Sequence, residues 1–535
     1  MFTIRKSLLE LRHWTLVVIG VLLVSAAACC ASDKGGVGAL PAEEYARPQR
    51  YEGVRWRIVY ENCAGIQEFG VHELYGVVQG FVPYTLEVGD RSDLAEGKDN
   101  IILIGTADGN AEIKGMVAAG LIPAPARDQG YTITCFTSKA LGGRREIVVA
   151  GFDDRGVAYG AFELCKRLLS IPREANDGTL QDRLSQLGDL RISEAPSVET
   201  RGIWCWGYTI YDYRGFLDNM ARLKYNKIII WNDVPPRNAD EFIHYAHDRG
   251  IKVVFGFSWG WGLKDLDPNN AAQKEEVKKR VLETYRTQLR PLQLDGIYFQ
   301  TFTETFKTHA GSRTIAALYC EWVNDIAGAL LQQNPGLKIE AGLHASSVRN
   351  DLDDLKGLDP RLQIVWEDAG GMPWSYDPLR DPPKGPAADK WDTPEKTLAY
   401  AKQLATLRYS GEFQMVAKGW TILSWATKFE HHGDFLIGVR NRDYIRARSS
   451  ERRSRWDYVN TLWLENYSWV QHFYKEIRHV SRQPMTVLAL VEDGVLEERI
   501  EPSVALGAEL LWNPDRSADE ILNGALSPYF GASGR

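Results

Sequence analysis

Short apolar runs alternate with segments of helical length along most of this sequence of 535 residues. Between residues 54 and about 170, runs typical of strands are interleaved with stretches that have a helical period, which predicts a small α/β sandwich. We expect its strands at Trp56–Tyr60, Asn100–Gly105, Tyr131–Thr137 and Glu146–Ala150, and its helices near Gln67–Gln79, Ala111–Ala119 and Val157–Leu169.

Beyond residue 198 the same alternation returns at longer intervals. The apolar runs are Arg201–Tyr208, Lys227–Asn232, Lys252–Ser258, Gly296–Thr301, Lys338–His344, Gln363–Trp366, Gly419–Trp425 and Ala508–Trp512. Helices are expected at Tyr213–Leu223, Ala239–Arg249, Ala271–Leu289, Thr314–Gln333, Thr393–Tyr409 and Trp456–His479. Eight buried strands that alternate with helices predict a closed (β/α)8 TIM barrel with insertions. An open, doubly wound sheet is the alternative, because periodicity does not reveal closure.

The N-terminus has the features of an export signal. Basic residues precede an apolar run over residues 15–28 that is too short for a comfortable membrane span. Ala26–Cys29 also resembles a loose bacterial lipobox, so a lipid anchor at Cys29 is the alternative to plain secretion. We therefore expect a bacterial protein that is secreted, periplasmic or membrane-anchored as a lipoprotein.

These patterns divide the chain into five segments. Residues 1–30 are the signal and 31–50 a Gly-, Ala- and Pro-rich tether. Residues 51–172 form the N-terminal α/β domain, and 173–198, which lack a strong period, are expected to be a linker. Residues 199–535 form the barrel, which we expect to be the catalytic domain.

Composition narrows the function. The chain has 63 Lys and Arg against 70 Asp and Glu, a net charge of −7, which argues against nucleic acid as the main partner. The cysteines after the signal are widely spaced without a CxxC pair, which predicts neither a disulfide framework nor a zinc site. No Walker loop, HExxH helix or dinucleotide fingerprint follows a suitable strand, so no metal and no cofactor is expected. The chain has 17 Trp but only 6 Met. Indole rings gathered in one cleft would suit the flat apolar faces of a sugar ring.

Active sites of TIM barrels lie at the carboxyl ends of the strands, so the residues that end each apolar run are the candidates. Nearly every run ends in an indole, an amide or a carboxylate. The candidate substrate-binding residues are Trp204, Trp206, Trp231, Asn232, Asp233, Trp259, Trp261, Gln300, His344, Trp366, Trp425, Glu430 and Trp512. For any single Trp, packing in the core is the alternative interpretation.

Three carboxyl groups are the candidate catalytic residues. Glycoside hydrolysis needs one carboxylic acid to protonate the leaving oxygen and a second carboxylate on the opposite face of the sugar. Glu304 follows the fourth run between Phe302 and Phe306, where partial desolvation would suit an acid; a helix-start Glu is the alternative. Glu367 and Asp368 follow the sixth run and are candidates for the second carboxylate, with Glu430 a weaker competitor. Neighbours on a strand point to opposite sides, so only one of the pair is expected to face the substrate.

Several segments resemble known glycosidases. Gly151–Leu164 looks like the close of the small N-terminal domain of bacterial β-hexosaminidases and family 67 α-glucuronidases, and Arg201–Trp204 with Phe216–Lys227 is similar to their first barrel strand and helix. His247–Val254 is similar to their approach to the third strand. The resemblance implies a two-domain glycoside hydrolase.

The resemblance also implies roles for particular residues. In α-glucuronidases a Glu after strand four is the acid, and acidic residues after strands six and seven serve the base; Glu304 and Glu367 or Asp368 occupy comparable places. Hexosaminidases have an Asp-Glu pair after strand four, where this chain has Thr303-Glu304. An α-glucuronidase must also hold a uronate carboxylate. The arginines between residues 440 and 455 are candidates for that contact, as is Lys428, although such a run is more often a solvated helix face.

The sequence therefore predicts a secreted glycoside hydrolase that acts on an oligosaccharide or polysaccharide through paired carboxylates, and the resemblance points toward an activity like that of the α-glucuronidases. A hydrolase like the β-N-acetylhexosaminidases and a non-catalytic carbohydrate-binding barrel are the alternatives. Gly256–Gly260 matches the GxSxG pattern of serine esterases, but no helix is expected to follow at once, so that interpretation is disfavoured.

Overall fold

The computed structural model describes residues 50–90, 99–139, 142–171, 182–232, 234–368, 393–408, 412–420, 434–481, 484–491 and 496–530. The expected export signal with Cys29 lies outside these residues, as does the tether up to residue 49. Gly53–Arg535 form one compact unit, which holds both the α/β sandwich and the barrel. No helix among the described residues has the length and apolar character needed to cross a bilayer.

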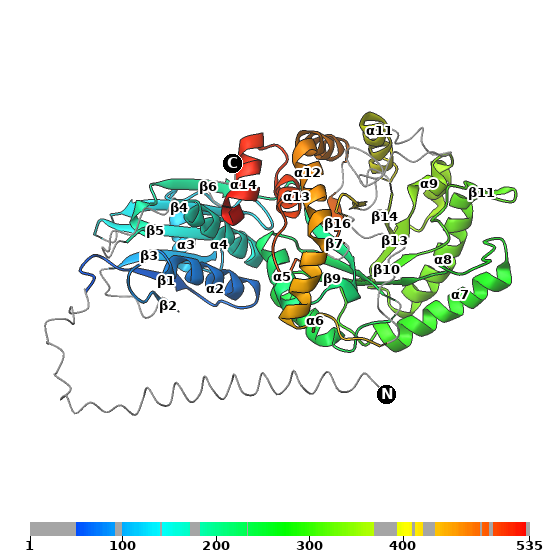
Figure 1. The fold of residues 1–535 in the computed structure, drawn as a ribbon, viewed down its shortest axis with the longest axis horizontal. Coiled ribbons are helices and arrows are strands. Elements are labelled where there is room, and N and C mark those ends of the chain that lie inside the picture. The colour runs from blue at the N-terminus through cyan, green and yellow to red at the C-terminus, as the bar shows by residue number, and fades with distance from the viewer. Residues whose placement is uncertain are drawn as a thin grey trace, which may run out of the picture. The chain divides into compact units, whose positions relative to one another are not determined.

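Six strands in the order β2-β1-β3-β5-β4-β6 form the sheet of the N-terminal sandwich (Figure 1). β2, β1, β3 and β5 run parallel, whereas β4 pairs antiparallel with β5 and β6. Helices α2 and α4 pack on one face of the sheet and α3 on the other. The strands are β1 Trp56–Tyr60, β2 Glu87–Asp90, β3 Asn100–Thr106, β4 Tyr131–Ser138, β5 Arg144–Gly151 and β6 Leu190–Glu194, and the helices are α2 Ile66–Gln79, α3 Ala111–Ala118 and α4 Asp154–Leu169.

Strand β6 belongs to the segment that the sequence predicts to be a linker. It pairs with β4 from Leu190 to Glu194, and a 3-10 turn, η2 (Leu184–Gln186), precedes it. Every second residue of β6 is only partly buried and the others are exposed. An edge strand with so little buried surface leaves a weak alternation, which explains why the sequence pattern did not reveal it.

Eight parallel strands close into the barrel in the order β7-β8-β9-β10-β13-β14-β15-β16, which confirms the predicted TIM barrel (Figure 1). The strands are β7 Thr200–Trp206, β8 Lys227–Trp231, β9 Lys252–Ser258, β10 Gly296–Gln300, β13 Ile339–Leu343, β14 Gln363–Trp366, β15 Phe413–Ala417 and β16 Met485–Leu490. The helices are α5 Tyr213–Arg222, α6 Ala239–Asp248, α7 Ala271–Thr284, α8 Ile315–Gln333, α9 Ala345–Val348, α11 Pro394–Ala405, α12 Arg442–Val480, α13 Pro502–Trp512 and α14 Ala518–Phe530. Short elements complete it: η3 Gly207–Thr209, the π-helical turn η4 Tyr285–Leu289, η5 Leu352–Gly357, and the hairpin strands β11 His309–Ala310 and β12 Arg313–Thr314.

The last two strands differ from the prediction. The seventh strand is Phe413–Ala417, before the predicted run Gly419–Trp425, and the eighth is Met485–Leu490. The predicted eighth strand, Ala508–Trp512, is wrong because it is the end of helix α13. A continuous apolar run does not by itself distinguish a buried strand from a buried helix. All residues of α13 after its first are buried, so the helix lacks the polar face that would have identified it.

Several helices begin at a side chain that caps the first turn. The capping residues Asn110, Asp153, Asp212, Asn270 and Asn441 each accept a backbone N–H of the first turn. Such caps satisfy N–H groups that have no partner inside the helix. They fix the points at which the chain leaves a loop and starts a helix, on the sandwich for Asn110 and Asp153 and around the barrel for the other three.

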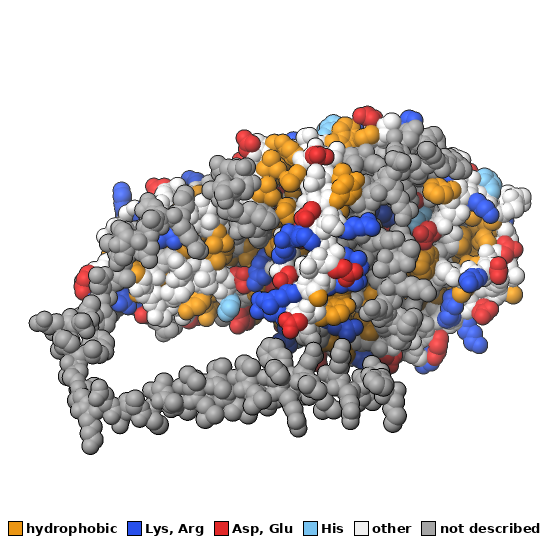
Figure 2. Space-filling model, in the orientation of Figure 1, with side chains coloured by type: hydrophobic (Ala, Val, Ile, Leu, Met, Phe, Trp, Pro, Cys, Tyr) orange, Lys and Arg blue, Asp and Glu red, His pale blue; other side chains and the backbone are white. Residues whose placement is uncertain are grey.

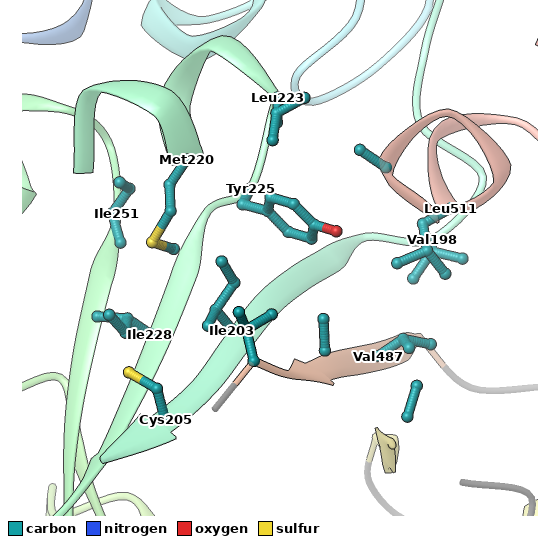
Figure 3. Close-up of a cluster of buried hydrophobic side chains, with 14 of the residues drawn as sticks. Val198, Ile203, Cys205, Met220, Leu223, Tyr225, Ile228, Ile251, Val487 and Leu511 are labelled. Carbon is teal, nitrogen blue, oxygen red and sulfur yellow. The ribbon is translucent and has the colours of Figure 1, made fainter. Parts of the chain in front are cut away.

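Alternate residues of each barrel strand face the interior or the surrounding helices. On the outer side of β7, Ile203 and Cys205 lie among side chains of neighbouring strands and Met220 of α5 (Figure 3). On the inner side, Trp204 belongs to a separate apolar cluster with Ile229, Val365 and other inward residues. This period of two decides which strand-end residues can reach the centre of the barrel.

The amino-terminal end of the barrel interior contains a buried ion pair. The Lys227 ammonium on β8 donates to Oε1 of Glu340 on β13 at 2.6 Å and to Oε1 of Gln414 on β15 at 3.3 Å. Both charged side chains are about 95% buried. The pair therefore joins opposite walls of the barrel inside the protein.

We expect Lys227→Met to destabilise the protein by about 3–5 kcal/mol, because it leaves the buried Glu340 without its partner. Guanidinium unfolding followed by Trp fluorescence measures the change. The double variant Lys227→Met, Glu340→Leu removes both charges and should recover most of the loss. A single variant as stable as the original protein would contradict this role of the pair.

Candidate active site

Aromatic rings line the carboxyl end of the barrel interior. Trp204 of β7 lies edge-on to Trp206 with ring centroids 5.4 Å apart, and it stacks on Trp231 of β8 at 6.4 Å. Tyr298 of β10 lies 5.8 Å from Trp231. Two partly exposed rings continue the series: Tyr208 stacks on Trp206 at 5.9 Å, and Trp261 lies edge-on to Trp231 at 5.6 Å. We call these six residues the aromatic wall.

Two glycines make room for the aromatic wall. A Cβ atom at Gly256 of β9 would lie 2.7 Å from the Tyr298 ring and 2.8 Å from the Trp231 ring. A Cβ atom at Gly342 of β13 would lie 2.4 Å from the Tyr298 hydroxyl oxygen. Since real Cβ atoms do not approach other atoms so closely, larger residues at these positions would displace the rings.

Glu304 contacts the exposed edge of the aromatic wall. Its Oε2 accepts a hydrogen bond of 2.6 Å from the indole Nε1 of Trp261, and its side chain is exposed. The expectation that neighbouring phenylalanines desolvate Glu304 is wrong. Phe302 packs away from it, edge-on to Trp322 at 5.3 Å, and Phe306 is 42% exposed.

Glu367 lies at the buried end of the aromatic wall. Tyr298 donates its phenolic hydrogen to Oε1 of Glu367, and Gln300 donates from Nε2 to the Tyr298 oxygen at 2.8 Å. Only 3% of Glu367 is exposed. Burial raises the pKa of Glu367 to about 8; the ammonium of Lys418 opposes this rise and the neighbouring Asp368 adds to it. Glu367 therefore keeps its proton at neutral pH.

Asp368 points away from the barrel interior. Its Oδ1 accepts hydrogen bonds from the backbone N–H groups of Ala345 and Ser346, at the start of the short helix α9. Burial raises the pKa of Asp368, whereas the Lys418 ammonium and these hydrogen bonds lower it. Because the oxygens of Asp368 bind the loop after β13, Glu367 is the member of the pair that faces the aromatic wall.

Glu304 and Glu367 are connected through the aromatic wall. Glu304 accepts a hydrogen bond from Trp261, whose ring contacts Trp231. Trp231 in turn contacts the ring of Tyr298, and the Tyr298 hydroxyl donates to Glu367. The strands that carry these residues end at the same edge of the barrel. Both carboxyl groups thus lie at the carboxyl end, one exposed and one buried.

Lys418 and His344 lie close to Glu367. Lys418 follows β15, where alternation with Gln414 and Val416 turns it inward, and it forms no ion pair or hydrogen bond with the described residues around it. His344 follows β13 and is buried, and its Nδ1 atom has no hydrogen-bond partner among the described residues. Burial and, to a smaller extent, the Lys418 ammonium lower the pKa of His344, so its ring is neutral at pH 7. The sequence missed Lys418 because the seventh strand was expected six residues later.

Two predicted tryptophans, one directly after β9 and one at the end of β14, pack away from the interior. Trp259 stacks on Phe299 at 3.7 Å, and Trp366 lines a small pocket between β14 and α11. Both occupy outward positions of the alternation. For these residues the core interpretation applies.

Trp512 lies in helix α13, against the N-terminal sandwich. It stacks on Tyr131 at 5.8 Å, and the Lys224 ammonium lies 4.4 Å from its ring. Its neighbour Glu509 pairs with Lys166 of α4. Arg201, near the start of β7, lies 5.1 Å from the ring, so Trp512 is at the opposite end of that strand from Trp206. Trp512 therefore joins the sandwich to the barrel.

Asn232 has a local structural contact. Its Oδ1 accepts a hydrogen bond of 3.1 Å from the backbone N–H of Gly207, so it links the loops after β7 and β8. Asp233, Trp425, Lys428 and Glu430 lie outside the described residues. Their predicted roles stay predictions.

Comparisons with known proteins found similarity in structure only. No protein-family model and no curated protein sequence matches the chain. Among solved structures, the chain is similar to CpGH84B, with 12% identity and a TM-score of 0.48 over 91% of this chain and 72% of the other. It is also similar to BtGH115A, a family GH115 4-O-methyl-α-glucuronidase with specificity for decorated arabinogalactans (16% identity, TM-score 0.49, 90% of this chain), and to a GH138 enzyme targeting pectin rhamnogalacturonan II (14%, 0.44, 87%). This chain spans 60% and 52% of the length of these last two. The function proposed below rests on this chain's own side chains.

Proposed function

We propose that this protein is a glycoside hydrolase in which Glu304 and Glu367 are the two catalytic carboxyl groups. The observation that supports this most directly is a buried, protonated Glu367 at one end of the aromatic wall, with the exposed Glu304 hydrogen-bonded to the other end. Glycoside hydrolysis requires two carboxyl groups in different states of protonation, and different environments are the usual means of producing them.

The environments suggest a role for each residue. Glu367 keeps its proton up to about pH 8 and is therefore the proton donor to the leaving oxygen. Glu304, exposed and held by the Trp261 indole, is the second carboxylate, which attacks the sugar or activates water. This assignment reverses the roles expected from the sequence, because the structure buries Glu367 and leaves Glu304 exposed.

The aromatic wall and Lys418 suggest the kind of sugar. The partly exposed rings of Tyr208 and Trp261 offer apolar faces on which a pyranose ring can pack. Lys418 offers a cation near Glu367 that no described residue neutralises by direct contact. We propose a glycan that carries an acidic sugar, as an α-glucuronidase would take, and we propose that the protein meets it outside the cytoplasm because of the export signal.

A screen of aryl glycosides and glucuronic-acid-decorated oligosaccharides tests this function. Release of a sugar from at least one substrate is expected, and proton NMR of the first anomer formed distinguishes retention from inversion. Binding of such oligosaccharides without any release of sugar would contradict hydrolysis and favour a non-catalytic carbohydrate-binding barrel.

Lys418→Met is expected to change both the pH profile and the substrate preference. Loss of the ammonium raises the pKa of Glu367 further, so the alkaline limb of kcat/KM should move to higher pH. Turnover of a glucuronide should fall about tenfold or more relative to that of the matching neutral glycoside, the effect expected from losing a charge-assisted hydrogen bond. Lys356→Met, which removes an exposed charge on η5, is the control. An unchanged alkaline limb would contradict this placement of Lys418.

A further inference from the structure

Glu367 differs from other buried glutamates in the side chain that binds its carboxyl group. Acidic side chains on the surface lie among Lys and Arg, as Figure 2 shows over helix α12. Four buried glutamates also pair with Lys or Arg, namely Glu163, Glu340, Glu501 and Glu509. Glu367 forms no ion pair among the described residues, and the side chain that donates to it is the neutral phenol of Tyr298. A directly bonded cation would keep Glu367 ionised, whereas a neutral donor leaves its protonated form available.

The Tyr298 hydroxyl takes part in two hydrogen bonds. Its oxygen accepts a hydrogen bond of 2.8 Å from Nε2 of Gln300, and its hydrogen is donated to Oε1 of Glu367. A hydroxyl has a single hydrogen, and because Gln300 is the donor to the phenol oxygen, that hydrogen is left for Glu367. At most 7% of any of the three residues is exposed, so bulk water does not compete for these bonds.

The Tyr298 ring has little room to move. It lies edge-on to the Trp204 ring at 6.2 Å and to the Trp231 ring at 5.8 Å. A Cβ atom at Gly256 would lie 2.7 Å from the ring, and a Cβ atom at Gly342 would lie 2.4 Å from the hydroxyl oxygen. The ring thus passes close to the backbone of both neighbouring strands, and its hydroxyl reaches across β13 to the carboxyl group that follows β14. This packing fixes the position of the donor.

The bond from Tyr298 distinguishes the two oxygens of Glu367. A protonated carboxyl group has one oxygen that carries the hydrogen and a carbonyl oxygen that is the better acceptor. Oε1 accepts from Tyr298, which favours Oε2 as the oxygen that carries the acid proton. When that proton leaves, the phenol donates to a charged group, a bond about twice as strong as one between neutral groups. Tyr298 therefore stabilises the state after proton transfer more than the state before it.

We propose that Tyr298 is a positioning residue for proton transfer from Glu367, and that Gln300 orients its hydroxyl. The inference rests on the proposed function, in which Glu367 is the proton donor. In the transfer the O–H bond at Oε2 breaks and an O–H bond to the leaving glycosidic oxygen forms, while the electron pair of the cleaved C–O bond stays on that oxygen. The electron pair of the broken O–H bond stays on Glu367 as a carboxylate. The Tyr298 hydroxyl stabilises this carboxylate and keeps its own hydrogen.

Tyr298→Phe tests the proposal, because it keeps the ring and removes only the hydroxyl. The 4-nitrophenyl and 4-nitrobenzyl glycosides of the sugar released in the screen differ by one methylene, but only the second has a leaving oxygen that depends strongly on a proton. We expect kcat/KM to fall about tenfold or more on the 4-nitrobenzyl glycoside, the effect of losing a hydrogen bond to a charged group. The fall on the 4-nitrophenyl glycoside should not exceed about threefold, since its departure needs little acid catalysis. A change of packing alone would lower both rates equally.

The pH profile of Tyr298→Phe gives a second measurement. A donor to the carboxylate favours the ionised form, so its loss should raise the pKa of Glu367. The alkaline limb of kcat/KM for the 4-nitrobenzyl glycoside should therefore move to higher pH. The titratable groups described around Glu367 are Tyr298, His344, Asp368 and Lys418. Only the first changes in the variant, so the shift reports the loss of the hydroxyl.

Tyr225→Phe is the matched control. It removes the hydroxyl of another fully buried tyrosine, whose oxygen has no hydrogen-bond partner among the described residues. The ratio of the two rates and the alkaline limb should both stay unchanged. Equal falls on the two glycosides in Tyr298→Phe, or an alkaline limb that does not move, would overturn the proposal.

Gln300→Leu keeps the Tyr298 hydroxyl but removes the group that orients it. We expect a smaller change of the rate ratio in the same direction. If Tyr298→Phe does not fold, which circular dichroism checks, an unchanged ratio in Gln300→Leu overturns the proposal instead.

Failure of the proposed function would give a different result. It would appear as an original protein that hydrolyses no glycoside, and the pH dependence of unfolding would then still report the hydrogen bond. With the same proteins carrying Glu367→Gln as references, the free energy of unfolding should stop falling at a higher pH in Tyr298→Phe than in the original protein. The same pH in both would overturn the contact between Tyr298 and Glu367 as well.

Discussion

Glu304→Gln is expected to lower kcat by about 10²–10⁴-fold, the range that acid–base or nucleophilic carboxylates contribute, while the affinity for substrate stays within a few-fold. The amide keeps the size of the side chain and can accept the Trp261 hydrogen bond, but it neither attacks the sugar nor takes a proton from water. Steady-state kinetics on the best aryl glycoside and calorimetric titration of the inactive variant with the same substrate measure the two effects.

Trp261→Phe is the informative companion to this variant. It keeps a ring against Trp231 but removes the indole N–H that holds Glu304, so we expect a smaller loss of kcat than in Glu304→Gln. Glu283→Gln, at an exposed position paired with Arg286, should leave turnover unchanged. Full activity of Glu304→Gln would exclude Glu304 from the reaction.

The barrel was predictable because its first six strands are short and buried, and because helices of at least ten residues follow the first four of them. β9 and β14 were predicted to the residue, since Lys252–Ser258 and Gln363–Trp366 end at clear polar boundaries. β15 was missed because the inward Gln414 and the Lys418 that follows interrupt its apolar pattern. Gln414 is buried because it accepts a hydrogen bond from Lys227 and donates one to Gln363, contacts across strands that no local pattern reveals.

The candidate site was predictable only as far as strand alternation applies. That rule separated Glu367 from Asp368, since adjacent residues face opposite sides of a strand. Applied to single residues it also separates Val365 and Glu367, which face inward, from Trp366, which packs outward. Tyr298 was missed because it lies in the middle of β10, and its phenol reaches Glu367 only through the space that Gly342 leaves on the next strand. Long side chains, and the space left where a residue is glycine, bring residues of different strands into contact. The spacing of residues along the sequence does not reveal such contacts.

Glu367→Gln is expected to remove activity, also by about 10²–10⁴-fold, and at the same time to change how stability depends on pH. In the native protein burial raises the pKa of Glu367 from 4.5 to about 8, so the folded state holds the proton more tightly than the unfolded chain does. The stability contributed by this proton is fully present below pH 4.5 and is lost as the pH rises to about 8. The amide introduced by Glu367→Gln does not ionise, so the variant should become more stable than the original protein, by up to a few kcal/mol, as the pH rises through this window.

The free energy of unfolding, measured with guanidinium at about pH 5 and about pH 8.5, tests this effect, because the two pH values span most of the range between the two pKa values. Glu304→Gln is the matched control. Both variants should be inactive, but only Glu367→Gln should gain stability at the higher pH, because Glu304 is exposed in the folded state and Glu367 is not. Parallel stability curves for Glu367→Gln and the original protein would mean that Glu367 ionises freely in the folded state. It would then not hold the proton that the leaving oxygen must receive, and the roles of the two carboxyl groups would have to be exchanged.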